Sequence, residues 1–143
     1  MTAENFLDTN VLLYACSAVA EDAEKKEIAS DLILTADFGL SSQVLQEFIS
    51  NALRNPSLGI SETGIDATLE LATQVPVQAI DLSLVIQAVT LRRRYQLSHW
   101  DATIVAAAQA LGCRTLYSED LSHGQDWNGL RVVNPFRSGD REK

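Results

Sequence analysis

The sequence is poor in cysteine and in positive charge, and it has no long hydrophobic run. Its two cysteines, Cys16 and Cys113, lack the spacing of a metal-binding or redox motif, so we expect reduced thiols. No stretch reaches about eighteen consecutive apolar residues, and the first residues show no basic segment followed by an apolar core. These absences predict a cytoplasmic protein that neither enters a membrane nor depends on disulfides.

Size and composition fit one globular domain. The chain has 143 residues, of which 46% are hydrophobic and 21% are charged. A chain of this length buries a core large enough to fold without a structural metal. We expect one domain over residues 1–136 and a flexible tail over residues 137–143.

The shortage of positive charge limits how nucleic acid could be bound. Lysine and arginine number 11 against 19 aspartates and glutamates, which gives a formal net charge of −8. A protein that binds nucleic acid mainly by neutralising phosphates should be basic. Either nucleic acid is not the partner, or its phosphates are held at a local site where bound metal cations supply the positive charge.

The sequence lacks the motifs of several other classes of enzyme. There is no Gly-x-Ser-x-Gly elbow and no glycine-rich phosphate loop before a lysine. His99 and His123 lie in separate segments and form no metal-ligand pair. His99 is either a surface residue or a contact near a groove, and we favour the surface. Trp100 and Trp127 are expected to be packing residues rather than platforms for bases.

Short apolar segments alternate with amphipathic ones along the chain. Helical periodicity and turn residues predict a three-layer α/β/α domain with a mostly parallel central sheet of four to five strands. Ser61 and Ser98 are candidate helix N-caps, and Gly112 is a candidate helix-ending residue. The strands are expected near residues 6–7, 39–42, 75–80, 114–117 and 130–133, and the helices near 11–18, 22–37, 43–53, 61–73, 82–95 and 101–111.

Two acids directly follow predicted strands. Asp8 lies between a strand and a helix, where an aspartate is commonly an N-cap. The same place, at the carboxyl end of a parallel strand, is where open α/β sheets bind their ligands. Asp120 follows the strand near 114–117 in the same way, and the adjacent Glu119 leaves the identity of this acid open.

Two further acids lie on predicted helices. Glu47 lies off the apolar stripe of its helix, so it faces either water or a groove. Asp101 follows Ser98 by three residues, which resembles a capping box with aspartate in place of glutamate. A carboxylate in the first helical turn is also favoured in its ionised form, which suits a binding site.

The combination of these segments resembles the PIN-domain nucleases, and especially the VapC-type toxins of type II toxin–antitoxin systems. The resemblance spans nearly the whole chain except the tail, and its segments are FLDTNVLLYA, SSQVLQEFISNAL, LSHWDATIVAAAQALGC, LYSEDLSHGQ and GLRVVNPF. By this resemblance, Asp8, Glu47 and Asp101 are the three central catalytic and metal-binding acids. Asp120 matches the fourth, more variable acid, and Asn10 and Ser118 match supporting polar positions.

The resemblance implies an endoribonuclease that depends on Mg²⁺ or Mn²⁺. It also implies an RNA substrate, a small antitoxin protein as inhibitor, and a homodimer. Carboxylates gathered in one place repel one another, and a hard divalent cation removes that conflict while it activates water and holds a phosphate. Thr9 and Asn10 are expected to provide hydrogen bonds beside Asp8.

Two other functions remain open on the sequence. One is a PIN-like module that binds RNA or protein without catalysis, although all four acids are retained. The other is an aspartyl-phosphate enzyme. Such phosphatases need a second acid two residues after the first, where this chain has Asn10, so this alternative ranks third.

Overall fold

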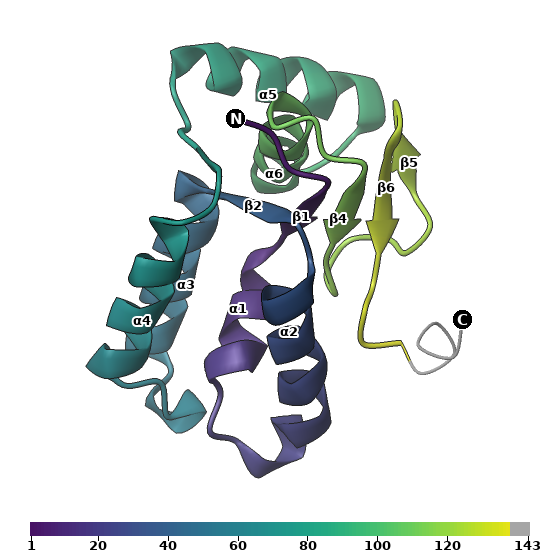
Figure 1. Ribbon diagram of the computed structural model, residues 1–143. Coiled ribbons are helices and arrows are strands. Elements are labelled where there is room, and N and C mark those ends of the chain that lie inside the picture. Colours follow the sequence, from purple (N-terminus) through teal and green to yellow (C-terminus); the bar gives the residue numbers. More distant parts are fainter. Residues whose placement is uncertain (138–143) are drawn as a thin grey trace.

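A computed structural model describes residues 1–137 of the chain, and all of the predicted tail over residues 137–143 except Arg137 lies outside the described residues. Strands alternate with helices, as the periodicity predicted, which confirms the α/β class (Figure 1). No helix in the described part of the chain is both long and apolar enough to span a bilayer. The strands are β1 (Asn5–Leu7), β2 (Phe38–Ser41), β3 (Val77–Gln78), β4 (Thr115–Tyr117), β5 (Asp126–Trp127) and β6 (Leu130–Val133). The helices are α1 (Thr9–Cys16), α2 (Ala23–Thr35), α3 (Ser42–Arg54), α4 (Glu62–Ala72), α5 (Leu82–Tyr95) and α6 (His99–Ala110), with 3-10 turns at Ala20–Asp22 and Pro56–Leu58.

The sheet is mostly parallel, with strand order β3-β2-β1-β4-β6-β5. Strand β1 lies in the middle, between β2 and β4, and pairs with both in parallel. Only the β5–β6 pair is antiparallel. In Figure 1 the α5–α6 pair lies above the strands and the α1–α2 pair lies below them.

The sheet has six strands, one more than the upper expectation, because β5 was not predicted. The two residues of β5 form a hairpin with β6 across Asn128 and Gly129, whose φ angles are 54° and 94°. Asn-Gly is a favoured pair for a two-residue hairpin turn, since both positions need positive φ. This dipeptide was therefore the available signal for β5.

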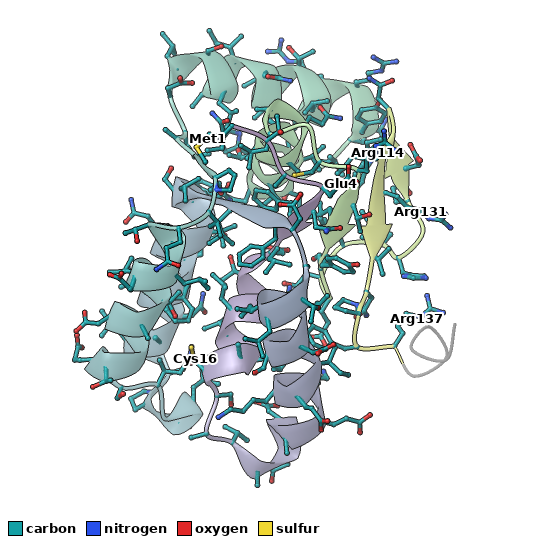
Figure 2. All side chains as sticks on the ribbon, in the orientation of Figure 1. Met1, Glu4, Cys16, Arg114, Arg131 and Arg137 are labelled. Atoms are coloured by element: carbon teal, nitrogen blue, oxygen red, sulfur yellow. The ribbon has the colours of Figure 1, made fainter. Side chains whose placement is uncertain are left out.

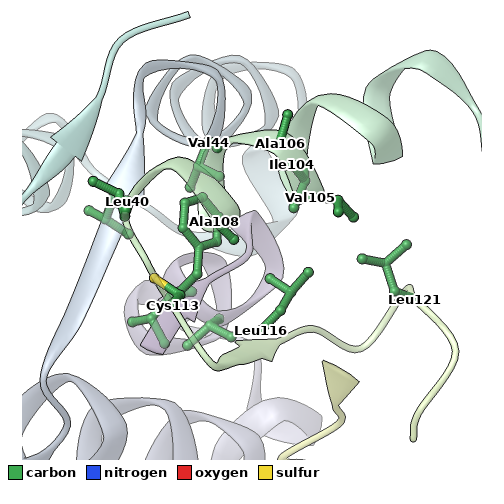
Figure 3. Packing of buried hydrophobic residues seen from close by; sticks show 14 of the residues in the cluster. Leu40, Val44, Ile104, Val105, Ala106, Ala108, Cys113, Leu116 and Leu121 are labelled. Atoms are coloured by element: carbon green, nitrogen blue, oxygen red, sulfur yellow. The ribbon is translucent and has the colours of Figure 1, made fainter. Parts of the chain in front are cut away.

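Helix α6 forms the centre of the core. Residues 102–108 are all buried, because α6 is packed between α5 and strands β2, β3 and β6 (Figure 3). Its alanines allow this close approach on all sides, and larger side chains such as Val105 and Leu116 fill the space that remains. Gly112 follows α6 with φ +74°, as expected of a residue that ends a helix.

The predicted caps explain where several helices begin. Ser61 Oγ accepts a hydrogen bond from the Gly64 N–H, and Ser98 Oγ accepts one from the Asp101 N–H at 3.1 Å.

Both cysteines are free thiols. Cys113 is buried in the core (Figure 3), whereas Cys16 lies at the end of α1 (Figure 2).

Candidate active site

The carboxyl ends of β1 and β4 bring two polar residues together at the middle of the sheet. Leu7 and Tyr117 are paired partners in the parallel β1–β4 ladder, so Asp8 and Ser118 leave the sheet side by side. The Asp8 N–H extends the ladder by donating to the Tyr117 carbonyl at 3.0 Å. From β1 the chain order runs to β2 and β3 on one side, and β4 lies on the other side. Such switch points form ligand crevices in open α/β sheets.

Asp8 is a buried carboxylate at the start of α1. It is the N-cap of the helix, with only 8% of its surface exposed. Oδ1 accepts a hydrogen bond from the Thr9 N–H and Oδ2 accepts one from Ser118 Oγ, both at 2.7 Å. Burial raises the pKa of Asp8 to about 6 against these two hydrogen bonds, and the charges of Asp120 and Glu47 raise it further.

The two residues after Asp8 connect it to two other acids. Thr9 Oγ1 donates a hydrogen bond of 3.2 Å to Glu47 Oε1. Asn10 Nδ2 donates one of 3.2 Å to Asp120 Oδ2, and its Oδ1 accepts from the Glu119 N–H. The first turn of α1 therefore holds carboxylates that come from α3 and from the loop after β4.

Ser118 supports the same cluster from the other strand. Its side chain is fully buried. While Ser118 Oγ donates to Asp8, it accepts hydrogen bonds from the N–H groups of Asp120 and Leu121 at 3.1 and 3.3 Å. One hydroxyl thus fixes both the orientation of Asp8 and the turn that carries Asp120.

Glu47 and Asp101 reach the site from two helices. The polar stripe of α3 does border a groove, because Gln43, Glu47 and Asn51 all line the same pocket as Asp8. In α6, only the serine half of the capping box forms: Ser98 accepts from the Asp101 N–H, and within residues 1–137 the Asp101 carboxylate makes no hydrogen bond. That carboxylate also lines the pocket and remains available to a ligand.

All four predicted acids line one pocket of about 210 Å³, which we call the acid pocket. Its lining residues are Asp8, Thr9, Asn10, Leu13, Gln43, Glu47, Asn51, Trp100, Asp101, Ile104 and Asp120. Within the described residues, however, no group of three or more Asp, Glu, His or Cys side chains is close enough together to coordinate a metal ion as it stands. Hydrogen bonds hold Asp8, Glu47 and Asp120 on separate partners, which keeps their like charges apart.

The acid next to Asp120 has a different environment. Glu119 accepts a hydrogen bond from Tyr14 Oη at 2.6 Å and forms an ion pair with Lys25. The bond to Glu119 raises the pKa of the Lys25 ammonium. Glu119 lines a neighbouring polar cleft but does not line the acid pocket, whereas Asp120 lines both.

Sequence reasoning missed part of the wall of this pocket. Trp127 is a packing residue, as predicted, and is 3% exposed. Trp100 is not, because 64% of its surface is exposed at the start of α6, where it borders the acid pocket. His99 is half-buried rather than a plain surface residue, and it lines the cleft next to that pocket. The direction of these side chains depends on how α6 packs against α3 and α5, which no local pattern reveals.

Solved structures share this fold. VapC20 of Mycobacterium tuberculosis, described as a toxin that cleaves the sarcin-ricin loop, superposes with a TM-score of 0.64 at 22% identity, over 81% of this chain and 89% of that chain. A chain of a toxin–antitoxin complex from Klebsiella pneumoniae gives 0.65 at 19% identity, over 92% and 98%. A chain of DNA-bound VapBC from Salmonella typhimurium gives 0.64 at 19% identity, over 92% and 97%.

At 19–22% sequence identity, these superpositions show a shared fold, whereas the sequence itself shows the family. None of the curated proteins compared with the chain matches it. The sequence model of the PIN domain family matches residues 6–123, a span that runs from β1 to the loop after β4 and contains every acid of the pocket. Since that match covers well over half of the chain, this protein belongs to the PIN domain family.

Proposed function

We propose that this protein is a metal-dependent ribonuclease and the toxin of a toxin–antitoxin pair. The observation that carries the proposal is the acid pocket, in which Asp8, Glu47, Asp101 and Asp120 from four separate segments line one small space at the switch point of the sheet. Relatedness to the PIN family and likeness to the fold of a toxin described as cleaving an RNA loop support the same activity.

The donor set fits a hard divalent cation. Every acid in the pocket offers carboxylate oxygen, which Mg²⁺ and Mn²⁺ prefer, and no histidine or cysteine lines this pocket within the described residues. The buried, crowded Asp8 carboxylate is costly to ionise, and a cation would relieve that cost. Magnesium sites commonly use one or two direct carboxylates and several waters, so the separation of the acids suits such a site.

Asp8 and Asp101 are the residues we expect to hold the ion most directly. Asp8 is fixed by two short hydrogen bonds, and Asp101 has no competing partner within residues 1–137. Glu47 and Asp120, which are anchored through Thr9 and Asn10, complete the negative field around it. When bound, Mg²⁺ or Mn²⁺ supplies the positive charge that stabilises a phosphodiester under attack and acidifies water for that attack.

The chain's own groups orient and restrain the reaction. Thr9 and Ser118 keep the Asp8 carboxylate in one direction, so little reorganisation is required when charge develops on the phosphate. Glu47 lines the pocket and is held there by Thr9 Oγ1, so we expect it to accept the proton of the attacking water. The apolar walls from Leu13 and Ile104 limit the space that bulk water can occupy.

The antitoxin and the homodimer belong to the same proposal. Chains with this fold have been solved in toxin–antitoxin complexes. Helices α2 and α3 both pack on α1, and each leaves a large apolar side chain exposed: Leu34 at 83% and Leu53 at 60%. We propose that a small antitoxin packs on the exposed sides of these two helices and places an arginine or lysine against the acid pocket. The homodimer rests on the family resemblance alone and stays a prediction.

The activity is tested on the purified full chain with single-stranded RNA and Mg²⁺ or Mn²⁺. We expect cleavage that is lost with a chelator and lost in Asp8→Asn, but retained in Asp66→Asn, whose acid is exposed on α4 outside the acid pocket. Cleavage that survives the chelator or Asp8→Asn contradicts the proposal. Metal binding without cleavage of any RNA would identify the non-catalytic binding module instead.

A further inference from the structure

Three clefts adjoin along the surface and form one trough with the acid pocket in its middle. On one side the acid pocket shares Gln43, Glu47 and Trp100 with a cleft of about 520 Å³, which we call the apolar cleft. On the other side it shares Asn10, Asn51 and Asp120 with a polar cleft of about 360 Å³. A linear polymer with its reacting bond over the acids would therefore extend into both end clefts.

The apolar cleft presents an aromatic face to solvent. The starts of α3, α5 and α6 and the segment before α5 form its walls, and Val85, Ile80, Trp100 and His99 are among its lining residues. Trp100 is 64% exposed, and the His99 ring packs edge-on against it at 5.1 Å between centroids. A large exposed aromatic beside a reactive site is a common platform on which an unpaired base stacks.

A buried acceptor without a partner lies at the junction of the apolar cleft and the acid pocket. Gln43 Nε2 donates to the Trp100 carbonyl at 3.3 Å, which anchors the amide to the start of α6. That bond leaves Gln43 Oε1 buried, and in residues 1–137 it is the one buried side-chain polar atom with no hydrogen-bond partner. Gln43 therefore ties the start of α3 to the start of α6, which fixes Trp100 between the acid pocket and the apolar cleft.

Charge along the trough explains why stacking would matter. Within the described chain, no lysine or arginine lines the acid pocket or either end cleft. Arg114, Arg131 and Arg137 lie instead around β4, β6 and the chain that follows them (Figure 2). The lysine next to the polar cleft, Lys25, is already paired with Glu119, so contacts to the bases of a bound strand must contribute more of the affinity.

We propose that the apolar cleft binds one unpaired base of the RNA, next to the phosphate that is cut. The base stacks on Trp100, whose backbone is held by Gln43. A base in a duplex has neither its faces nor its pairing edge free, so this subsite selects single-stranded or looped RNA. The proposal rests on the proposed ribonuclease function and assigns its substrate subsite.

Tryptophan fluorescence gives a readout that is independent of activity. The chain has two tryptophans, so Trp127→Phe leaves Trp100 as the reporter. In a Glu47→Gln background, which removes the expected proton acceptor but keeps Asp8 and Asp101, a mixed-sequence 12-nucleotide single-stranded RNA is titrated with Mg²⁺ present. We expect saturable quenching of Trp100 by the single strand and little by the same RNA annealed to its complement. Equal quenching by both, or none by either, overturns the proposal.

Steady-state cleavage kinetics of variants that keep Trp127 provides an independent test. Trp100→Ala should raise KM roughly 5- to 150-fold with a smaller change in kcat, as for loss of one base stack, and Trp100→Phe should recover most of it. Ile86→Ala is the matched control, because Ile86 is also a large exposed apolar residue, next to Val85 on α5, but does not line the cleft. Equal effects of Trp100→Ala and Ile86→Ala contradict the proposal.

Two outcomes separate this inference from others. If the wild-type chain cleaves no RNA, the ribonuclease proposal fails, whereas the quenching titration still decides whether the cleft binds a base. If Trp100 emission instead changes with protein concentration alone, in step with dimer formation in sedimentation, the cleft is an interface between two copies and the base-binding proposal is wrong.

Discussion

Ser118 Oγ donates a hydrogen bond of 2.7 Å to Oδ2 of Asp8, across 110 positions of the sequence. The bond connects the ends of two adjacent parallel strands, β1 and β4. Because the same hydroxyl accepts the N–H groups of Asp120 and Leu121, one buried atom couples the direction of Asp8 to the turn of the fourth acid. The proposed centre is therefore part of the core of the fold rather than an addition to its surface.

Removing this hydroxyl should harm both stability and function. Ser118→Ala leaves one carboxylate oxygen and two backbone N–H groups without their partner, so the free energy of unfolding should fall by about 1–3 kcal/mol in urea denaturation. RNA cleavage should fall roughly 10- to 100-fold, as for other residues that orient a metal ligand. Ser122→Ala, at an exposed serine in the same loop, should change neither value. Equal stability of the two variants would show that the Ser118 bond is not what holds the site.

Because Asp8 is buried, its ionisation should lower the free energy of unfolding of the metal-free protein. Since its folded pKa is raised to about 6 from 3.8, the folded state holds a proton that the unfolded chain releases between these values. The contribution of Asp8 to stability is thus fully present below about pH 4 and lost as the pH rises to about 6. At neutral pH without metal, the loss corresponds to about 3 kcal/mol.

Asp8→Asn removes that ionisation. In chelator, the melting temperature of the variant should exceed that of the wild type at pH 7–8, and the difference should shrink towards pH 4. The gain will be smaller than the full penalty, because an amide cannot accept both hydrogen bonds that Asp8 receives. Thermal melts of the two proteins across this pH range check the sign. A wild type that is the more stable at pH 8 without metal would contradict it.

Adjacent acids should respond differently to neutralisation. Asp120 is exposed and faces the acid pocket, so Asp120→Asn should weaken the apparent Mg²⁺ affinity in RNA cleavage with little change in unfolding free energy. Glu119→Gln breaks a half-exposed ion pair with Lys25 and a charged partner of Tyr14, so it should cost up to about 1 kcal/mol of stability and leave Mg²⁺ dependence unchanged. The reverse pattern would assign the fourth acid to Glu119.

RNA binding should depend only weakly on monovalent salt. Each phosphate neutralised on a single strand contributes a slope of about −0.7 in log affinity against log salt, and no lysine or arginine of the described chain lines the trough. At fixed Mg²⁺ we expect a slope no steeper than about −2. A slope near −4 would indicate that basic residues elsewhere hold the strand, such as the three consecutive arginines at the end of α5.

The sequence predicted those parts of the fold that depend on local patterns. The bounds of Leu82–Tyr95 and Leu130–Val133 agree residue by residue, and the caps at Ser61 and Ser98 form as expected. Strand β5 was missed because two residues carry no periodicity, although its Asn128-Gly129 turn was readable. The alternation of strands and helices was enough to identify a mostly parallel sheet.

The site was predicted in composition rather than in geometry. Asp8 and Asp120 could be placed because residues after parallel strands share one edge of the sheet, and Glu47 because it left the apolar stripe. The exposure of Trp100 and the unpaired oxygen of Gln43 arise where α3, α5 and α6 meet, so only the folded chain reveals them. The distances among the acids likewise depend on three-dimensional packing.

The central claim is that the acid pocket binds a divalent cation, and Mn²⁺ binding followed by electron paramagnetic resonance tests it most directly. The loss of the free-ion signal on titration of the purified chain measures binding without any RNA. We predict saturable binding that Mg²⁺ displaces, that Asp8→Asn and Asp101→Asn each abolish, and that Asp66→Asn leaves unchanged. Absence of saturable binding, or binding that survives both pocket substitutions, would contradict the account.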